Sequence, residues 1–442
     1  MCEHQSVNIR HISQDWAEQM GYYRFLDNEQ VSVSELVRSL SSHCQTQVQA
    51  RHVLAISDTS EVNLQAHIGR IDGEGLGVLG NDRDLGFFIH PTLVLDGTCG
   101  FPLGISHVHL WSRPVEHLSK QARRYKELPI EEKESFKWLE SAMGSERCLE
   151  AGGASLVTHI GDREADIYEE WVRVPGRGHH VLIRACRDRS IAQSSKTLFD
   201  YLSEQPCQGT YHFTVTADKR KGRSQREALM AVRFVPLTIE RPKRLKDTDY
   251  PPSVSLYALE AQEVQPPPGQ SPIHWRLLTT HPVTILEQAL QVIQWYSWRW
   301  QIEQLFAILK GGGFNIEATQ LESGRGIQRL CVLALGAAVQ VLQLQEGRDD
   351  PHQAASVVFS QHQQQCLSDL AVTLEGRTQK QQNPYPPYTL AWASWLIARL
   401  GGWSGLQSQR PPGIRTLFKG LQRFEGIFQG WGLTHRQDVY TR

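Results

Sequence analysis

The chain lacks paired cysteines. Its eight cysteines are scattered singly and form no Cys-x-x-Cys motif. Because zinc ribbons and disulfide frameworks need cysteines at short fixed spacings, the sequence indicates neither kind of site. Isolated thiols are typical of a reducing compartment, so we expect a cytoplasmic protein.

Long apolar runs and an excess of one charge are also missing. No run of about 18 apolar residues occurs, so we expect no membrane span. The first sixteen residues are polar and charged and do not resemble a signal peptide. A net charge of −1 means that any binding to nucleic acid must depend on local basic patches. With 442 residues, of which 40% are hydrophobic, the chain is long enough for about two to four domains.

One stretch, residues 296–310, concentrates polar side chains of a kind that carries chemistry. On a helix, Tyr296, Arg299, Glu303 and Lys310 fall within an arc of about 60°, and apolar residues fill another sector. Three glycines at 311–313 then end the helix. No second acid in this stretch balances the two cations. The pattern favours a carboxylate that holds a metal ion, with Arg299 and Lys310 on phosphate oxygens. The alternative is a surface helix with a solvated charged stripe.

Two further acids stand at the ends of expected buried strands. Asp58 follows the apolar run 52–57, and Asp162 follows 154–161. If Asp58, Asp162 and Glu303 gather in space, their mutual repulsion implies a bound divalent cation. Oxygen ligands suit Mg²⁺ or Mn²⁺, and two such ions suit phosphoryl transfer. The alternative for each aspartate is a turn or helix cap.

The rest of the chain predicts a mixed α/β protein with helical ends. Around the two aspartates we expect a hairpin of strands at 86–96 and 101–111, a helix at 115–143 and a strand at 179–184. Residues 206–285 read as antiparallel strands, with basic clusters at 219–226 and 241–246 that suit DNA-backbone contact or serve only as solubilising turns. Helices are expected at 21–26, 32–40, 327–344, 390–400 and 416–424.

The spacing Tyr-x2-Arg-x3-Glu-x6-Lys at 296–310 resembles the signature of bacterial cut-and-paste DDE transposases. The group is the insertion-sequence-four family, in particular its Tn-five-like branch. Segments in the same order as in that branch add to the likeness, which runs from Tyr22 to about residue 432: 53–59, 134–139, 162–166, 274–279 and 397–402.

This resemblance implies an RNase H-like catalytic core, a mixed sheet flanked by helices, with an antiparallel β insertion and a helical C-terminal region. It implies that Asp58, Asp162 and Glu303 form the catalytic, metal-binding triad for Mg²⁺ (or Mn²⁺), as two ions. It further implies that DNA is contacted by Tyr296, Arg299, Lys310 and Arg184, and that Trp275 stacks on a flipped base.

The expected organisation is a partial N-terminal DNA-binding region (1–50), the first part of the core (51–205), the β insertion (206–285), the second part of the core (286–345) and a dimerisation region (346–442). The expected protein is a homodimeric transposase that cuts, forms hairpins at and joins DNA. Its partners would be double-stranded transposon inverted-repeat ends and target DNA, without a membrane, and it would associate with the nucleoid when DNA-bound. Only 21 residues precede the segment beginning at Tyr22, fewer than in the family, so the alternative is a shortened inhibitor that dimerises with active transposase. A host nuclease unrelated to transposition would have no need of the 296–310 stripe or the β insertion.

Overall fold

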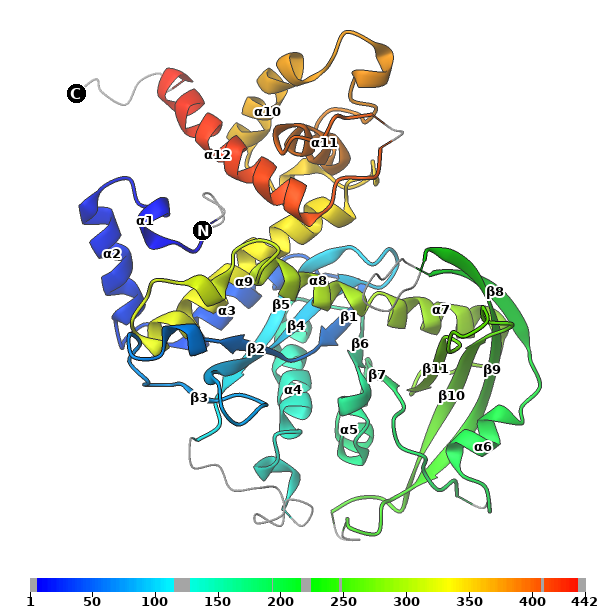
Figure 1. The fold of residues 1–442 in the computed structure, drawn as a ribbon. Coiled ribbons are helices and arrows are strands. Elements are labelled where there is room, and N and C mark those ends of the chain that lie inside the picture. The colour runs from blue at the N-terminus through cyan, green and yellow to red at the C-terminus, as the bar shows by residue number, and fades with distance from the viewer. Residues whose placement is uncertain are drawn as a thin grey trace.

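The computed structural model of the chain is built on one mixed, 11-stranded sheet (Figure 1). Its main path runs β2-β4-β1-β6-β7-β11-β10-β9-β8, and β3 and β5 pair with β4. The structure describes residues 6–114, 128–192, 194–215, 224–245, 249–406 and 409–435.

The first half of the sheet has the strand order of an RNase H-like core. Strands β4 and β5 form an antiparallel hairpin, β4 pairs antiparallel with β1, and β6 and β7 lie parallel to β1. The resulting order β5-β4-β1-β6-β7 confirms the expected fold class. Val53, Leu54 and Ile56 of β1 are fully buried, as is typical of a central strand covered on both faces. The strands are β1 (His52–Ser57), β2 (Ser60–Asn63), β3 (Gly77–Val78), β4 (Leu85–Asp96), β5 (Pro102–Trp111), β6 (Leu156–Gly161) and β7 (His179–Arg184).

The β-rich segment continues this sheet rather than forming a separate one. Strand β11 pairs antiparallel with β7 through residues 277–279, and β10, β9 and β8 follow in antiparallel order. The four strands are β8 (Gly209–Val215), β9 (Arg226–Glu240), β10 (Ser253–Glu263) and β11 (His274–Thr279). The insertion is therefore attached to the core by backbone hydrogen bonds.

Helices cover both faces of the core sheet. Helices α4 and α5 lie on one face, and α3, α8 and α9 lie on the other (Figure 1). Ser32 caps α3 by accepting a hydrogen bond from the Glu35 N–H at 3.2 Å, as the Ser-x-x-Glu pattern predicts. The helices up to this point are α1 (Ile9–Ile12), α2 (Trp16–Asp27), α3 (Val33–Gln45), α4 (Phe136–Ala151), α5 (Tyr168–Arg173) and α6 (Leu198–Ser203). Part of the expected helix at 115–143 lies outside the described residues, and the remainder begins only at Phe136.

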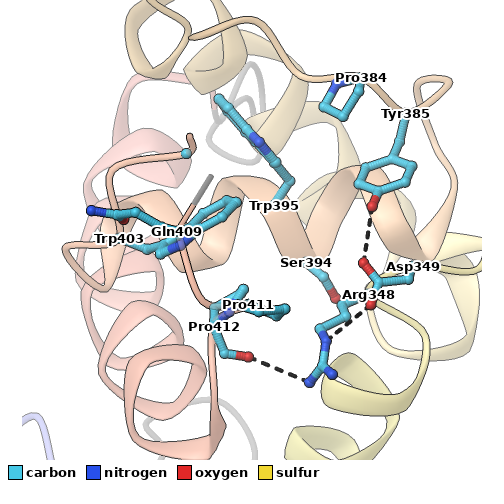
Figure 2. A pocket seen from close by; sticks show the side chains of 11 residues that line it. Arg348, Asp349, Pro384, Tyr385, Ser394, Trp395, Trp403, Gln409, Pro411 and Pro412 are labelled. Atoms are coloured by element: carbon cyan, nitrogen blue, oxygen red, sulfur yellow. Dashed lines mark hydrogen bonds and ion pairs between the residues drawn. The ribbon is translucent and has the colours of Figure 1, made fainter. Parts of the chain in front are cut away.

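The C-terminal helices pack around the far half of α9 (Gly324–Glu346). That helix is long and apolar enough to cross a membrane, but 78% of its most apolar window is buried, as in a core helix. A cavity of about 250 Å³ lies among these helices, lined by Trp395 and Trp403 on one side and by Arg348, Asp349 and Tyr385 on the other (Figure 2). The helices are α10 (Gln361–Leu374), α11 (Leu390–Leu400) and α12 (Ile414–His435). Short 3₁₀ turns occupy Gln65–His67, Ile130–Glu132, Arg163–Ala165, Ile316–Ala318, Ala355–Val357 and Gln379–Gln381.

Candidate active site

Parallel strands bring three of the predicted residues to one edge of the sheet. Asp58 directly follows β1, Asp162 directly follows β6, and Arg184 is the last residue of β7. Because β1, β6 and β7 run parallel and adjacent, their carboxyl ends share one edge. The apolar runs that form these strands thus position the polar residues that follow them.

The stretch 296–310 forms two helices rather than the single expected one. Helix α7 (Leu286–Ser297) has Trp298 as its C-cap, and α8 (Trp300–Leu309) has Arg299 as its N-cap. Across the junction the backbone stays in the right-handed helical region, but the amide of Arg299 bonds the carbonyl of Tyr296, and that of Gln301 bonds Trp298. These i to i−3 bonds make a tighter turn than an α-helix. Tyr296 therefore belongs to α7, and Glu303 to α8.

The junction is seated on the turn between β4 and β5. The indole N–H of Trp295 donates to the carbonyl of Gly97 at 2.9 Å, and the side-chain amide of Gln301 donates to that of Gly100 at 2.8 Å. Trp298 lies so close to Gly100 that a Cβ there would stand 2.6 Å from its ring. Gly100 also has a φ of +74°, which favours glycine. These contacts fix the position of the helix that carries Glu303.

Arg299 lies between two of the three acids. Its guanidinium donates to Asp58 Oδ2 at 2.8 Å and to Glu303 Oε1 at 2.5 Å. The Arg299 and Asp58 side chains are 15% and 20% exposed, so solvent screens their pair only in part. The structure thus brings Glu303 of α8 to the same arginine as Asp58 of β1.

The surroundings of Asp58 disfavour its ionised form. Burial raises its pKa from 3.8 to about 6, and the charges of Asp162 and Glu303 raise it too, whereas Arg299 and the Thr59 amide work in the other direction. Asp162 and Glu303 therefore act on Asp58 through their charge, and Glu303 also shares Arg299 with it. One arginine does not offset burial plus two neighbouring negative charges.

A second layer of polar contacts fixes the segment around Asp58. The hydroxyls of Ser57 and Thr92 lie 2.8 Å apart, and the Thr59 hydroxyl lies 2.8 Å from Nδ1 of His90. Thr92 and His90 both belong to β4 and are fully buried. Strand β4 therefore holds the backbone on both sides of Asp58.

Tyr296 and Trp275 form an aromatic row beside the acids. The two rings meet edge to face at 5.9 Å, and Trp275 meets Phe213 at 5.2 Å. Burial raises the pKa of Tyr296, which Arg299 and Arg184 lower in part, so the phenol stays protonated near both guanidiniums. Arg184 also donates to the backbone carbonyl of His274 at 2.9 Å. Tyr296, Trp275 and Arg184 thus come together from α7, β11 and β7.

Lys310 lies apart from this group and has an acidic partner. It follows the end of α8, and its Nζ is 3.3 Å from Oε1 of Glu317. No second acid lies within 296–310, but the fold supplies acids from outside it. Arg299 pairs with Asp58 as well as with Glu303, and Lys310 pairs with Glu317. These acids come from other turns and strands, which spacing within one helix does not reveal.

The expected basic clusters of the β insertion are partly described. Residues 216–223 and 246–248 lie outside the described residues. Arg226 forms an ion pair with Glu263, Arg241 donates to the carbonyl of Tyr250 at 2.7 Å, and Arg244 pairs with Glu169 at 3.4 Å. These three arginines therefore make contacts within the chain rather than serving only as solubilising turns.

The acids at this edge fit a hard divalent cation by their chemistry. Asp58, Asp162 and Glu303 offer carboxylate oxygens without nitrogen or sulfur ligands, the donor set that Mg²⁺ and Mn²⁺ prefer. Burial is the largest cause of the raised pKa of Asp58, and the charges of Asp162 and Glu303 add to it. Within the described residues, three possible ligand atoms within 4.8 Å of one another occur elsewhere, at Glu146, Glu150 and His179. The ligand oxygens of Asp58, Asp162 and Glu303 therefore lie further apart than those of a closed metal site, with Arg299 between Asp58 and Glu303.

Two features of this edge were not found from the sequence. Glu170 of α5 is buried, and burial together with the charges of Asp166 and Asp162 raises its pKa well above the usual range. A cavity of about 700 Å³ adjoins the acids and is lined by Thr59, Arg163 and Glu164 next to them and by Lys137 and Trp111 further out. A signal for the buried acid is the position of Glu170 directly before Trp171 in a short helix that begins with Tyr168. The cavity has no sequence signal.

Two comparisons with known proteins bear on this chain. A family model described as "Transposase DDE domain" matches residues 170–340, which include Arg184, Trp275 and the α7–α8 pair but begin after Asp58 and Asp162. A solved structure of piggyBac transposase in a synaptic complex with hairpin DNA is similar at a TM-score of 0.36, with 8% identity over 98% of this chain and 72% of that one. From residue 170 to residue 340, the chain thus has the sequence pattern of a transposase DDE domain.

Proposed function

We propose that this chain is a DNA transposase that cuts DNA and joins the cut 3′ ends to a target by metal-dependent phosphoryl transfer. Its triad is Asp58, Asp162 and Glu303, which hold Mg²⁺ or Mn²⁺, as two ions. The observation that carries the proposal is the pairing of Arg299 with both Asp58, at the end of β1, and Glu303 of α8. Burial raises the pKa of that Asp58 carboxyl to about 6.

The roles of the side chains follow from their surroundings. The chemistry that bound Mg²⁺ or Mn²⁺ supplies in such a set is activation of a water or a 3′-hydroxyl and stabilisation of the leaving oxygen. Asp58, Asp162 and Glu303 provide the ligand oxygens. Arg299, held at the site by Asp58 and Glu303, offers a guanidinium to phosphate oxygens when those carboxylates take up metal.

The neighbouring residues suit the handling of DNA strands. Arg184 and Tyr296 place a cation and a phenol next to the acids for phosphate contacts. The half-buried indole of Trp275 is placed to stack on a base turned out of the duplex, as a hairpin step requires. Lys310 reaches phosphate only by exchanging its ion pair with Glu317.

The finer parts of the proposal concern the assembly. We propose that the substrates are double-stranded inverted-repeat ends, that two chains act together through the C-terminal helices, and that the protein works in the cytoplasm at the nucleoid. Helices α11 and α12 pack against α9, and α10 packs against α11 and α12, which gives these helices a fixed position relative to the core.

The decisive experiment is cleavage of labelled transposon-end DNA in Mg²⁺ by the wild type and by Glu303→Ala. We expect the variant to lose cleavage by roughly a thousandfold or more, because one metal ligand is removed. Circular dichroism and the melting temperature should stay close to those of the wild type, because Glu303 is partly exposed.

The matched control is Glu287→Ala, which removes an exposed acid in the first turn of α7. It should cleave like the wild type. Unchanged cleavage by Glu303→Ala would refute the triad. A wild-type chain that dimerises and suppresses an active transposase but never cleaves DNA would instead identify the shortened inhibitor.

A further inference from the structure

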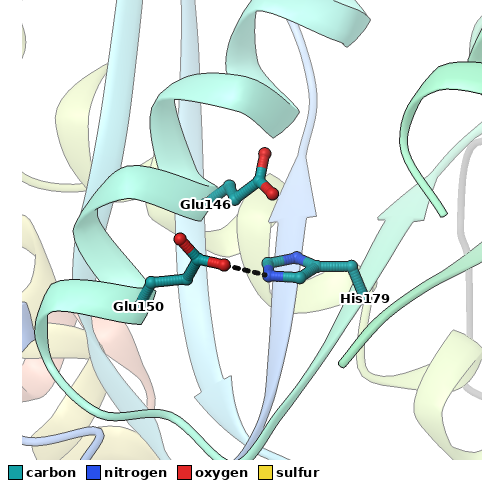
Figure 3. A group of neighbouring side chains, drawn as sticks. All are labelled: Glu146, Glu150 and His179. Carbon is teal, nitrogen blue, oxygen red and sulfur yellow. Dashed lines mark ion pairs between the residues drawn. The ribbon is translucent and has the colours of Figure 1, made fainter. Parts of the chain in front are cut away.

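A second group of metal-ligating side chains lies at the opposite edge of the parallel strands. Glu146 and Glu150 are one turn apart near the end of α4, and His179 is the first residue of β7 (Figure 3). One ligand atom from each lies within 4.8 Å of the others. Asp58 and Asp162 follow the far ends of β1 and β6, so this group is separate from the candidate active site.

His179 is the feature that distinguishes this group from a surface acidic cluster. Its side chain is 5% exposed, and its Nδ1 lies 3.1 Å from Nε2 of the buried His159, with the two rings stacked at 5.4 Å. That hydrogen bond needs one proton between the rings. With the proton on His179 Nδ1, its Nε2 carries a lone pair. Figure 3 shows the ring facing Glu150, with the Glu146 carboxylate nearby on the same helix. A hydrogen bond behind the ring is how proteins orient a metal-ligating histidine.

The distance between His179 and Glu150 favours a bridging ion over a direct bond. Nε2 lies 3.7 Å from Glu150 Oε1, beyond hydrogen-bond length, and no hydrogen bond to Nε2 comes from any described residue. Two ligands bound at about 2.0–2.2 Å in a tetrahedral site stand about 3.4 Å apart. A protonated His179 would only form a loose pair with Glu150, which is 61% exposed.

We propose that Glu146, Glu150 and His179 form a binding site for one transition-metal ion of the Zn²⁺ class. One imidazole nitrogen with two carboxylate oxygens suits Zn²⁺, whereas Mg²⁺ prefers oxygen ligands alone. The ion would join the end of α4 to the start of β7 and so brace the layer that supports β1 and β6. This site does not depend on the proposed transposase function.

The test is Zn²⁺ binding to the full chain in competition with a chromophoric chelator. The background is the double variant Asp58→Asn, Glu303→Gln, which weakens the other acidic set. We expect one Zn²⁺ per chain in that background and a higher melting temperature with Zn²⁺. Adding Glu146→Gln and Glu150→Gln should weaken binding at least about tenfold and abolish the rise in melting temperature. Both glutamates are at least partly exposed, so these variants should fold.

The matched control is Glu140→Gln, which removes an acid from the same helix that pairs with a different histidine, His109, at 3.1 Å. It should keep the tight Zn²⁺ site. Equal affinity with and without the Glu146 and Glu150 changes would overturn the proposal. So would the absence of tight Zn²⁺ in the Asp58→Asn, Glu303→Gln background when the wild type binds it.

Discussion

Buried carboxylates have opposite pKa shifts in the β insertion and at the candidate active site. Glu260 of β10 is 1% exposed and is surrounded by Arg233, Arg276 and His274 at 3.1, 3.1 and 2.7 Å. Although burial raises its pKa, these partners outweigh burial and lower it. Asp58 has one arginine, two acidic neighbours and a raised pKa. The insertion neutralises its acid with its own cations, whereas the single arginine at the candidate site leaves the pKa of Asp58 raised.

The largest effect on stability is expected at Glu260. Replacing it with alanine leaves Arg233, Arg276 and His274 together without their acid, so we expect a loss of about 3–5 kcal/mol in the free energy of unfolding. Urea denaturation would measure it. Removing the exposed Glu227 of β9 by Glu227→Ala should change stability by less than about 0.5 kcal/mol. If Glu260→Ala had the same free energy of unfolding as the wild type, the three partners would not depend on Glu260 for their stability.

The pH dependence of stability should have opposite signs at the two sites. The folded pKa of Asp58 is about 6 against 3.8, so the folded chain binds its proton more tightly, and stability from this group rises as pH falls from 7 to 4. As pH falls from 7 to 4 in a chelating buffer, the free energy of unfolding of the wild type should rise by up to about 3 kcal/mol relative to that of Asp58→Asn. The Glu260 contribution, with its lowered pKa, should be present at neutral pH and lost in acid.

Denaturation curves at several pH values, with and without Mg²⁺, would check this prediction. Mg²⁺ should make the rise in the free energy of unfolding at low pH smaller, because it competes with the proton for Asp58. A difference between the wild type and Asp58→Asn that stays constant from pH 4 to 7 would count against it.

A smaller effect is expected when Arg299 is replaced. Arg299 is the strongest group that lowers the pKa of Asp58. Arg299→Ala should therefore raise that pKa by about one unit, measured by NMR of labelled aspartate. Arg299→Lys, which keeps the charge without the two-pronged contact, should raise it less. An unchanged pKa in Arg299→Ala would mean that the guanidinium does not hold Asp58.

The sequence predicted those parts of the fold and site that depend on local pattern. Apolar runs ending in an acid predicted β1 with Asp58 and β6 with Asp162, and alternation predicted β8 to β11. The pairing of β11 with β7 was not predictable. It involves only three residues of each strand, and neither stretch carries a sequence pattern that identifies its partner. The junction at Trp298 and Arg299 was missed because both residues keep helical dihedral angles.

Contacts between distant segments were beyond prediction from pattern alone. Glu146 and Glu150 have the spacing of one helix face, but only the packing of α4 beside β7 brings His179 to them. In the same way, the partners of Arg299 and Lys310 come from other elements. Partner identity at such sites depends on tertiary structure, not on spacing.

The separation of Arg299 from Asp58 by 241 positions has a consequence for synthesis. A growing chain carries both aspartates long before α8 leaves the ribosome, and until then it lacks Arg299 and Glu303. If these residues form the catalytic set, an incomplete chain cannot cut the DNA of the cell that makes it. In that case the order of the segments along the chain would delay the activity until the sheet and its insertion have been made.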